Sequence, residues 1–568
     1  MRAAWSVVGL AVAGILSIVG WRSSVHQEQL ASEAALRGVS YVGSDACASC
    51  HPDHHRSWHR TFHRTMTQEA SDDAVLAPFD GRSLTYGGVV ATFYREGEEF
   101  RIHFSGPGQP RTARVARTVG SRRYQQFLAR EGNVYIRLPV AWHIEERRFI
   151  HMNSAFLTPD PQGLDEGRVD AADYDRHVTR WNDNCVFCHN VAPNPGLDGD
   201  RFDTEVAELG IACEACHGPG ARHAAENRDP LRRYRLHLGP EADPSIVNPE
   251  RLSPERSSEV CGRCHGQRIT DDLSAFLVRG DPFIPGEDLS RYSEPLFHDS
   301  SLDGERVFGA RFWSDGTPRL TAYEYQGLLQ SSCANDPEFA CTSCHGMHEG
   351  DPRGQLRPRD DEDELCTTCH SEYADAEAEA AHSEHPATLE CTDCHMPKVV
   401  YGLIGAHRSH RIEIPDPAAD RPDACTLCHV ERSKHWASAA LGVDGEVREG
   451  SALERLLAAG DPIERALAAA ALGRPNARNR AQDGQRMGLL VDAMVEDSYP
   501  AVRFIAARSL RSLAAPIELD YREHWGPTER RRWAEAFLRA QPGLVLPDPA
   551  RQAALRAESE TVAIEIGE

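Results

Sequence analysis

The chain has 568 residues, a length that suits two to four ordinary domains. Charged residues make up 26% of it, which excludes a disordered or fibrous composition. The formal net charge of -24 argues against a nucleic-acid partner, because phosphate binding needs a basic face.

Residues 1–40 are predicted to form a targeting segment and a linker. Arg2 precedes an uncharged, mostly apolar run over residues 3–21, whose 19 residues approach the length that spans a bilayer. A cleaved signal peptide usually has a shorter apolar core and a small-residue cleavage site, and residues 20–29 offer no good site. The sequence therefore favours a retained N-terminal anchor in the membrane, with a cleaved signal as the alternative.

The cysteine pattern predicts the cofactor, because 16 of the 17 cysteines fall in eight copies of Cys-x-x-Cys-His, the c-type haem attachment motif. Two thiols at this spacing lie on one side of a helical turn and can add to the two vinyl groups of a porphyrin, while the histidine binds the iron. The predicted attachment residues are Cys47, Cys50, Cys185, Cys188, Cys213, Cys216, Cys261, Cys264, Cys341, Cys344, Cys366, Cys369, Cys391, Cys394, Cys425 and Cys428. The predicted proximal ligands are His51, His189, His217, His265, His345, His370, His395 and His429.

Two other interpretations of the cysteines are four Cys₄ zinc sites and eight disulfides. Neither requires a histidine after every second cysteine, and histidine is only 27 of the 568 residues. We therefore expect eight covalently attached haem c groups. Cys333 stays without a partner and is predicted to be a buried structural thiol.

The remaining histidines are numerous enough to give every iron a second, distal imidazole. After His26 and His524 are set aside as outside the haem region, seventeen are left for eight irons. The predicted distal ligands are His63, His223, His348, His410, His385, His407 and His382. Further candidates are His59, His143, His151, His177, His298 and His435, with Met347 and Met396 as sulfur alternatives.

A long gap between the first two motifs predicts a small β-rich insertion over about residues 79–159. Four segments of this gap are rich in Val, Tyr, Phe and Ile, namely residues 84–94, 99–104, 112–119 and 134–140. Residues 95–98 are predicted to form a hairpin turn. We expect this insertion to cover one end of the haem chain or to form a docking face.

The region from residue 184 to 430 holds seven motifs in 247 residues, about one per 35. This density leaves few apolar side chains for an ordinary core, so the porphyrins must supply core surface. We expect a mainly α haem domain over residues 41–436, with short helices and long loops packed on the haems. Closely spaced porphyrins would form an electron relay.

Residues 437–548 contain no cysteine and are predicted to form a helical, HEAT-like segment. Ser451-x-x-Glu454 and Asp461-Pro462-Ile463-Glu464 are helix starts, and residues 497–510 resemble a HEAT-repeat helix. Trp533 and Phe537 suggest a further amphipathic helix. We expect this segment to pack on the haem domain, and residues 549–568 to be disordered.

Several motifs resemble a known group of multihaem cytochromes. Trp58-x-x-Thr61-x-His63 after the first motif resembles the group around the tetrahaem cytochrome of the hydroxylamine pathway, which includes hydroxylamine oxidoreductase and pentahaem nitrite reductase. Cys213-Glu-Ala-Cys-His217 followed by Gly-Pro-Gly and His223 looks like the same group, and Cys391-Thr-Asp-Cys-His395-Met-Pro is similar to a motif of membrane-linked cytochromes. The resemblance covers roughly residues 41–436.

This resemblance implies periplasmic electron transfer and leaves catalysis open, because the group contains both carriers and enzymes. Its enzymes keep one haem iron open on the distal side. Nitrite reductases often use a lysine as the proximal ligand there, whereas all eight motifs here end in histidine. Hydroxylamine oxidoreductase cross-links a tyrosine to its catalytic haem, and no such tyrosine can be assigned in this sequence.

We therefore expect an electron carrier on the outer side of the cytoplasmic membrane. It would relay electrons between a membrane donor linked to quinol and a periplasmic acceptor protein, and would contact the membrane through its N-terminal segment. The alternative is a reductase or oxidoreductase that acts on a small nitrogen or sulfur compound at one open iron. A third possibility is a binding module of a larger complex in which the HEAT-like segment dominates. No catalytic residue can be named.

Overall fold

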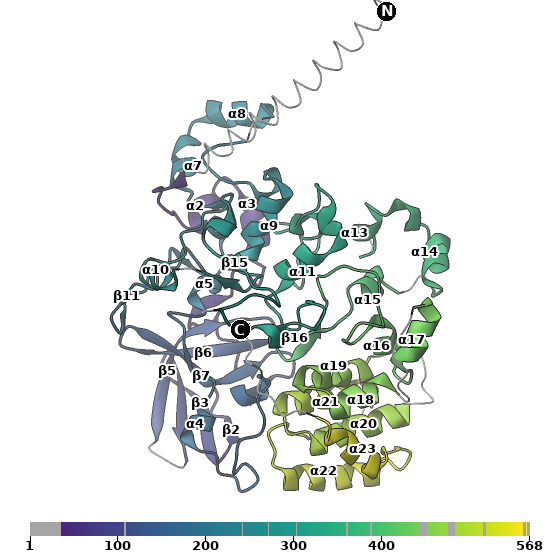
Figure 1. Cartoon of the computed structure of the whole chain (residues 1–568). Helices are drawn as coiled ribbons and strands as arrows, with labels where there is room; N and C mark the ends of the chain where they lie inside the picture. Colours follow the sequence, from purple (N-terminus) through teal and green to yellow (C-terminus); the bar gives the residue numbers. More distant parts are fainter. Residues whose placement is uncertain are drawn as a thin grey trace, which may run out of the picture.

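The structure is a computed structural model that describes residues 36–559 apart from 107–109, 241, 271, 303, 359–361, 387–388, 444–450, 475–482 and 515–518, together with Ile564. The predicted N-terminal anchor lies outside the described residues. The fold is mixed α/β: an antiparallel sheet, a middle region of short helices and loops, and a helical C-terminal region (Figure 1). The expectation of a mainly α chain is corrected, because the sheet is larger than predicted.

The sheet has nine strands in the described chain, with antiparallel pairing throughout. The strands β2 to β8 follow one another in sequence order, β1 pairs with β5, and β9 pairs with β7. The bounds are β1 (Thr67–Glu69), β2 (Ser83–Tyr86), β3 (Val89–Glu96), β4 (Glu99–Ser105), β5 (Arg111–Val119), β6 (Tyr124–Glu131), β7 (Val134–His143), β8 (Arg148–His151) and β9 (Thr179–Arg180).

The sheet covers the predicted segments and adds others. The single strand predicted over residues 84–94 is wrong, because the chain turns at Gly87 and Gly88 and forms the two antiparallel strands β2 and β3. The expected turn joins β3 to β4, where Glu96 pairs with Glu99 and Gly97 has a φ of 62°, a value that suits glycine. Strand β6, whose first six residues are all buried, was not predicted from the sequence. A strand buried on both faces lacks the alternation of apolar and polar residues by which a half-buried strand is recognised.

Aromatic side chains form the core of the sheet. The rings of Phe93 and Phe149 stack with their centroids 3.5 Å apart, and Phe79 meets Phe93, Phe100 and Phe127 edge to face. These residues come from β3, β4, β6, β8 and the loop before β2, so they join distant parts of the sheet. The sheet therefore has a protein core of its own.

The middle region consists of short helices, and each of the eight motifs begins on or beside one of them. The helices that carry motifs are α2 (Ser44–Ala48), α5 (Val186–His189), α6 (Cys213–His217), α9 (Pro254–Gly262), α12 (Cys341–Cys344), α13 (Glu364–Thr367), α15 (Cys391–His395) and α16 (Ala424–Cys428). The others are α3 (Pro52–Trp58), α4 (Ala171–Tyr174), α7 (Ala221–Glu226), α8 (Pro230–Leu238), α10 (Leu273–Arg279), α11 (Glu324–Gln330), α14 (Ala376–Ser383) and α17 (Lys434–Leu441).

Short two-stranded pairings and 3-10 turns connect these helices. The strands are β10 (Asn190–Val191) with β13 (Glu208–Leu209), β11 (Leu197–Asp198) with β12 (Arg201–Phe202), β14 (Arg268–Ile269) with β15 (Glu294–Pro295), and β16 (Val400–Gly402) with β17 (Gly405–His407). The 3-10 turns are η1 (Met152–Ser154), η2 (Pro249–Arg251), η3 (Leu289–Arg291), η4 (Gly309–Arg311), η5 (Ser332–Asn335) and η6 (Ser371–Tyr373).

The C-terminal region contains α18 (Ala452–Ala459), α19 (Pro462–Leu472), α20 (Asp483–Glu496), α21 (Pro500–Leu513), α22 (Pro527–Ala540) and α23 (Pro549–Arg556). Ser451 caps α18, and Asp461 forms a capping box with Glu464 at the start of α19, which confirms both predicted helix starts. The assignment of these helices to HEAT repeats stays a prediction.

The last residues differ from the predicted disorder, since the structure places α23 there. Arg551 forms an ion pair with Glu454 of α18, and Gln552 also donates to that carboxylate. Leu555 is buried, and Ile564 pairs with Leu157. These contacts with residues far away in the sequence stabilise a segment whose own composition is polar.

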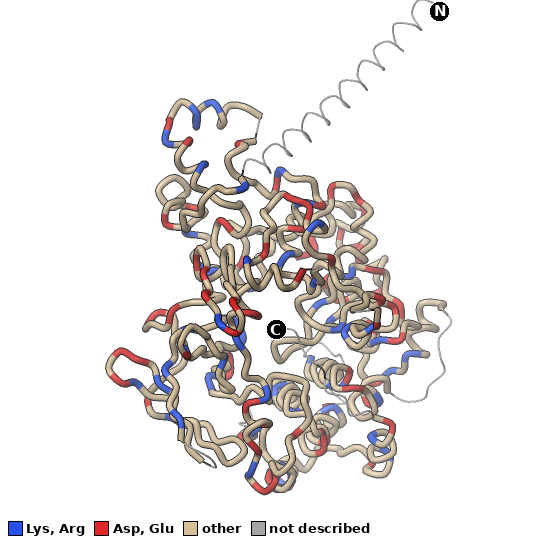
Figure 2. The backbone as a smooth tube through the Cα atoms, turned by 60° about the vertical axis from the view of Figure 1, so that its left-hand side comes forward, with Lys and Arg blue, Asp and Glu red and all other residues tan. Residues whose placement is uncertain are grey.

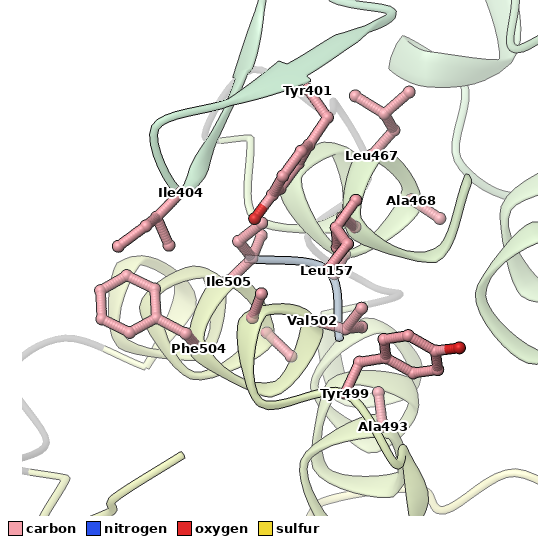
Figure 3. Packing of buried hydrophobic residues seen from close by; sticks show 14 of the residues in the cluster. Leu157, Tyr401, Ile404, Leu467, Ala468, Ala493, Tyr499, Val502, Phe504 and Ile505 are labelled. Atoms are coloured by element: carbon pink, nitrogen blue, oxygen red, sulfur yellow. The ribbon is translucent and has the colours of Figure 1, made fainter. Parts of the chain in front are cut away.

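One apolar core joins the C-terminal helices to the rest of the molecule. Leu157 follows the sheet, Tyr401 lies on β16, and both pack against Leu467 of α19 and Val502 and Ile505 of α21 (Figure 3). The hydroxyl of Tyr401 also donates to the carbonyl of Ala155 at 3.1 Å. The helical region is therefore continuous with the core beside the sheet. In the described part of the chain, no helix has the length and apolar character needed to cross a membrane.

Candidate haem-binding site

Most of the motif cysteines and histidines line one large, partly open cavity of about 2430 Å³. Seven of the eight motifs contribute to its lining, the exception being the motif of Cys47. Pockets for single small molecules usually measure about 300–1,000 Å³. The cavity therefore fits several large cofactors that share one space. We number the motifs 1 to 8 in chain order.

Pairs of motif thiols from different parts of the chain lie in direct contact. Four such pairs are formed: Cys47 with Cys213, Cys188 with Cys264, Cys261 with Cys341, and Cys366 with Cys391. Because these thiols mark the edge of each attached porphyrin, the contacts bring together motifs 1 and 3, 2 and 4, 4 and 5, and 6 and 7.

Electrostatic interactions between further thiols link these groups. The second thiol of each of three further pairs raises the pKa of the first through its charge. The pairs are Cys216 with Cys264, Cys344 with Cys366, and Cys394 with Cys428. These interactions join motifs 3 and 4, 5 and 6, and 7 and 8. The motifs therefore follow one another in space in the order 1, 3, 4, 5, 6, 7, 8, and motif 2 branches from motif 4.

Six motif histidines face a second imidazole at nearly the same spacing. An imidazole nitrogen binds a metal at about 2 Å, so two rings on opposite sides of one iron have centroids about 6 Å apart. The observed centroid distances are 6.2 Å for His51 and His223, 5.9 Å for His217 and His348, 6.1 Å for His265 and His63, 6.3 Å for His345 and His410, 6.1 Å for His395 and His382, and 6.0 Å for His429 and His385. This spacing fits two imidazoles on each of six irons.

Backbone carbonyls hold several of these rings through one nitrogen. The Nδ1 of His217 donates to Val247 at 2.7 Å, that of His345 to Gly354 at 2.9 Å, that of His395 to Glu413 at 2.8 Å, and that of His385 to Ser383 at 2.6 Å. A carbonyl can only accept, so Nδ1 carries the proton and Nε2 stays available for iron. The ring of His223 is held by Asp243 instead, with 3.1 Å between Nδ1 and the carboxylate.

Burial keeps three of the candidate ligands in the form that binds metal. Loss of solvent lowers the pKa of His63, His189 and His348 to about 4. These imidazoles are therefore neutral near pH 7, and a metal needs the neutral ring. His265 differs, because burial favours its neutral ring but the adjacent carboxylate of Glu324 raises its pKa to about 9.

Motifs 2 and 6 differ from the others. In the part of the chain that the structure describes, no second imidazole faces His189 or His370 at the spacing of the six pairs. The Nδ1 of His189 is also buried without a hydrogen-bond partner among the described residues. His407, the remaining predicted distal ligand, directs Nε2 at the carbonyl of Gly402 at 2.8 Å and Nδ1 at Arg123 at 3.5 Å. Its role as a ligand stays a prediction.

Other histidines lie away from the motifs or were not predicted as ligands. His143, His151 and His177 pack against Phe504, Tyr86 and Phe156. His54 was not predicted to take part, yet its ring lies 6.2 Å from that of His51, the same distance as His223, and stacks on that of His348 at 4.2 Å. Its position three residues after His51, on α3, was the available signal. Cys333 is only half-buried, which differs from the predicted buried thiol.

Comparison with known proteins adds evidence on the family. Residues 335–375, which include motifs 5 and 6, match the family model described as the doubled CXXCH motif. A stretch of 268 residues is 23% identical to the multiheme cytochrome MtrA of Shewanella baltica (strain OS185). The chain is a multihaem c-type cytochrome. It binds haem c covalently through Cys-x-x-Cys-His motifs, and its composition of repeated motifs is consistent with electron transfer.

The similarity to these proteins is partial. The match to MtrA covers 45% of this chain and 56% of MtrA, so the chain spans about half of that relative's length. The cytochrome is also similar to the crystal structure of the outer cell wall cytochrome OcwA, with a TM-score of 0.47 and 16% identity over 88% of this chain and 99% of that one.

Proposed function

We propose that this cytochrome carries eight haems and relays electrons between a membrane donor linked to quinol and a second redox protein outside the cytoplasmic membrane. The observation that carries the proposal is the unbroken series of motif thiols from motif 1 to motif 8 that either contact one another or interact electrostatically. A protein that only stored haem would not need neighbouring motifs in continuous succession. The apolar run over residues 3–21 supports the membrane side of the proposal.

The chain's own residues would control the reduction potential of each haem iron and the access of small molecules to it. A bound haem iron supplies reversible one-electron chemistry, and its potential depends on the axial ligands, burial and hydrogen bonding. The paired imidazoles would occupy both axial positions of six irons and so keep solvent and small molecules away from them. The carbonyls that accept from Nδ1 would orient these rings and raise their basicity.

The resemblance to the hydroxylamine oxidoreductase group supports a second candidate function for motifs 2 and 6. No described imidazole faces His189 or His370, so these are the positions where an iron would keep its distal side open. Such an iron would bind a small nitrogen or sulfur compound and draw electrons from the relay. Motif 2 suits this role well, because it branches from the relay and its loss would not interrupt the main series.

Low-temperature electron paramagnetic resonance of the oxidised holoprotein tests both functions. We expect low-spin signals from at least six haems, and mass spectrometry of the same sample should give eight haems per chain. High-spin iron that shifts with nitrite or hydroxylamine would favour the enzyme. High-spin iron at three or more haems would contradict the proposed axial pairs.

The HEAT-like segment fits a structural role in this proposal. Its helices α19 and α21 share one core with Tyr401 of β16, which lies between motifs 7 and 8. We propose that it supports the last haems of the relay. A partner protein that binds this segment would instead be lost when the chain is truncated after Ala437.

A further inference from the structure

The arm formed by α7 and α8, residues 221–238, stands away from the body of the molecule (Figure 1). None of the nine residues of α8 is buried. Leu231, Tyr234 and Leu238 are 80%, 67% and 68% exposed. Their spacing of three and four residues places them on one face of the helix. The arm therefore presents a stripe of large apolar side chains to its surroundings.

The arm is also basic, although the whole chain is acidic. Residues 221–238 contain five arginines and two acidic residues, in a chain of net charge -24. Figure 2 shows these basic positions along the arm. Arg232 is held by Glu226 at 2.8 Å and by Asp243 at 2.7 Å. Arg233 and Arg235 form no ion pair within the described residues, so their charge is available to a partner.

An apolar stripe flanked by arginines is typical of a helix that lies in the interface of an anionic membrane. The course of the chain gives an independent reason for this partner. Leu36, the first described residue, is fully buried and packs beside Gly218, at the base of the arm. The described chain therefore begins at the base of the arm, and the apolar run over residues 3–21 lies shortly before this point in the sequence.

We propose that α8 binds the surface of a bilayer rich in anionic phospholipid and turns the motif 1 end of the cytochrome toward the membrane. His223 of α7 faces His51 of motif 1 with 6.2 Å between ring centroids, so the arm is built directly onto this end of the relay. The binding of α8 to lipid stands on its own. Its consequence, that electrons enter at motif 1, rests on the proposed relay.

Hydrogen exchange of the full-length holoprotein, followed by mass spectrometry, tests the proposal locally. A short exposed helix exchanges quickly unless something covers it. We expect phosphatidylglycerol vesicles to slow exchange over residues 230–238, and neutral phosphatidylcholine vesicles to have little effect. Removing two arginines in Arg233→Gln/Arg235→Gln should weaken the association of the arm about 30-fold, since each basic residue near an anionic surface contributes about one kcal/mol.

Matched variants distinguish binding of α8 to lipid from a general effect of introducing aspartate at exposed apolar positions. Leu231→Asp/Leu238→Asp should abolish the protection by anionic vesicles. Val545→Asp/Leu546→Asp, an exposed apolar pair elsewhere that is not among the residues lining the cavity, should keep it. Haem content and complete reduction by dithionite, measured on the same samples, report on the relay and are expected to stay unchanged.

Three outcomes would overturn the proposal. The first is a holoprotein that does not associate with anionic vesicles. The second is association without protection of residues 230–238, which would place the contact elsewhere. The third is protection by soluble polyglutamate and not by anionic vesicles, which would indicate an acidic protein partner.

Discussion

The imidazole of His217 lies parallel to that of His348, with 5.9 Å between the ring centroids and 8° between the ring planes. His217 ends α6, and His348 follows α12, so a large part of the chain separates them. The ring of His217 is fixed by the carbonyl of Val247. Two rings in this relation can bind one iron from both sides, and the first prediction follows from them.

Replacement of His348 should leave one haem iron without its second imidazole ligand. In His348→Ala the haem of motif 3 loses its sixth ligand, so we expect about one haem equivalent to change from low spin to high spin. Low-temperature electron paramagnetic resonance measures this change. His237→Ala on the exposed face of α8 is the control and should leave the spectrum unchanged. An unaltered spectrum in His348→Ala would refute the pairing.

Removal of motif 5 should divide the relay, because this motif alone connects motif 4 to motif 6 in the described contacts. A ruthenium photosensitiser on Asp53→Cys, in a Cys333→Ser background, would inject electrons beside motif 1. In Cys341→Ala/Cys344→Ala we expect the haems of motifs 6, 7 and 8 to stay oxidised on the time scale of the intact relay. Transient absorption measures the number of haems that are reduced.

Motif 2, which branches from motif 4, provides the control for this experiment. Cys185→Ala/Cys188→Ala removes motif 2 and leaves the series from motif 1 to motif 8 complete. Electrons should still reach the last three haems in this variant. Equal transfer in both variants would contradict the proposed order.

A buried ion pair joins α21 to the segment after the sheet. Arg503 is fully buried and donates to the carboxylate of Asp160 at 2.7 and 2.8 Å. Arg503→Ala leaves that carboxylate with the longer contact to Arg530 at 3.5 Å and removes the donor to the carbonyl of Glu523, so we expect the free energy of unfolding to fall by about 3–5 kcal/mol. Urea denaturation followed by circular dichroism measures it.

An exposed arginine of the same region serves as the comparison. Arg531 lies 3.6 Å from Glu496, and its side chain is 62% exposed. Exposed pairs contribute about 0–1 kcal/mol, so Arg531→Ala should change the stability little. A similar loss in both variants would show that burial of the pair has no special effect.

The sheet region should lose stability in acid. Burial lowers the pKa of His143 from 6.5 to about 4, so the unfolded chain binds one more proton than the folded chain between these values. The buried neutral ring makes its full contribution to the free energy of unfolding above pH 6.5. This contribution is lost as the pH falls toward 4, by up to about 3 kcal/mol.

His143→Asn should reduce this dependence on pH. The Nδ1 of His143 accepts from the backbone of Glu146 at 3.1 Å, and an asparagine oxygen can accept in its place without titrating. Stability measured from pH 7 to pH 4 should fall less in the variant than in the parent protein. The same slope in both would assign the acid sensitivity to other groups.

Haem removal should unfold the middle region selectively. The cavity of about 2430 Å³ would be left without the cofactors that fill it, and interiors do not tolerate voids of this size. In protein produced without haem attachment we expect fast hydrogen exchange across residues 185–430. Helices α19 and α21 pack mainly on protein and should stay protected, which makes them an internal control. Protection of the middle region without haem would contradict this role of the cofactor.

The sequence by itself determined the attachment chemistry, because each Cys-x-x-Cys-His motif is complete within five residues and needs no distant partner. Local signals also predicted the turn at Gly97 and the helix starts at Ser451 and Asp461, since a cap or a two-residue turn depends on its immediate neighbours. The additional strand β6 could not be predicted, because successive side chains are buried on both of its faces and the alternation of apolar and polar residues is absent.

The tertiary structure decided which imidazoles face each other and in what order the motifs lie. His63 was a candidate for several irons, and only the fold brings its ring to 6.1 Å from His265. The contact of Cys47 with Cys213 brings together motifs 1 and 3, which are not consecutive in the sequence. Both relations depend on long-range packing, which a local pattern of residues does not encode, and they define the path that electrons would follow through the protein.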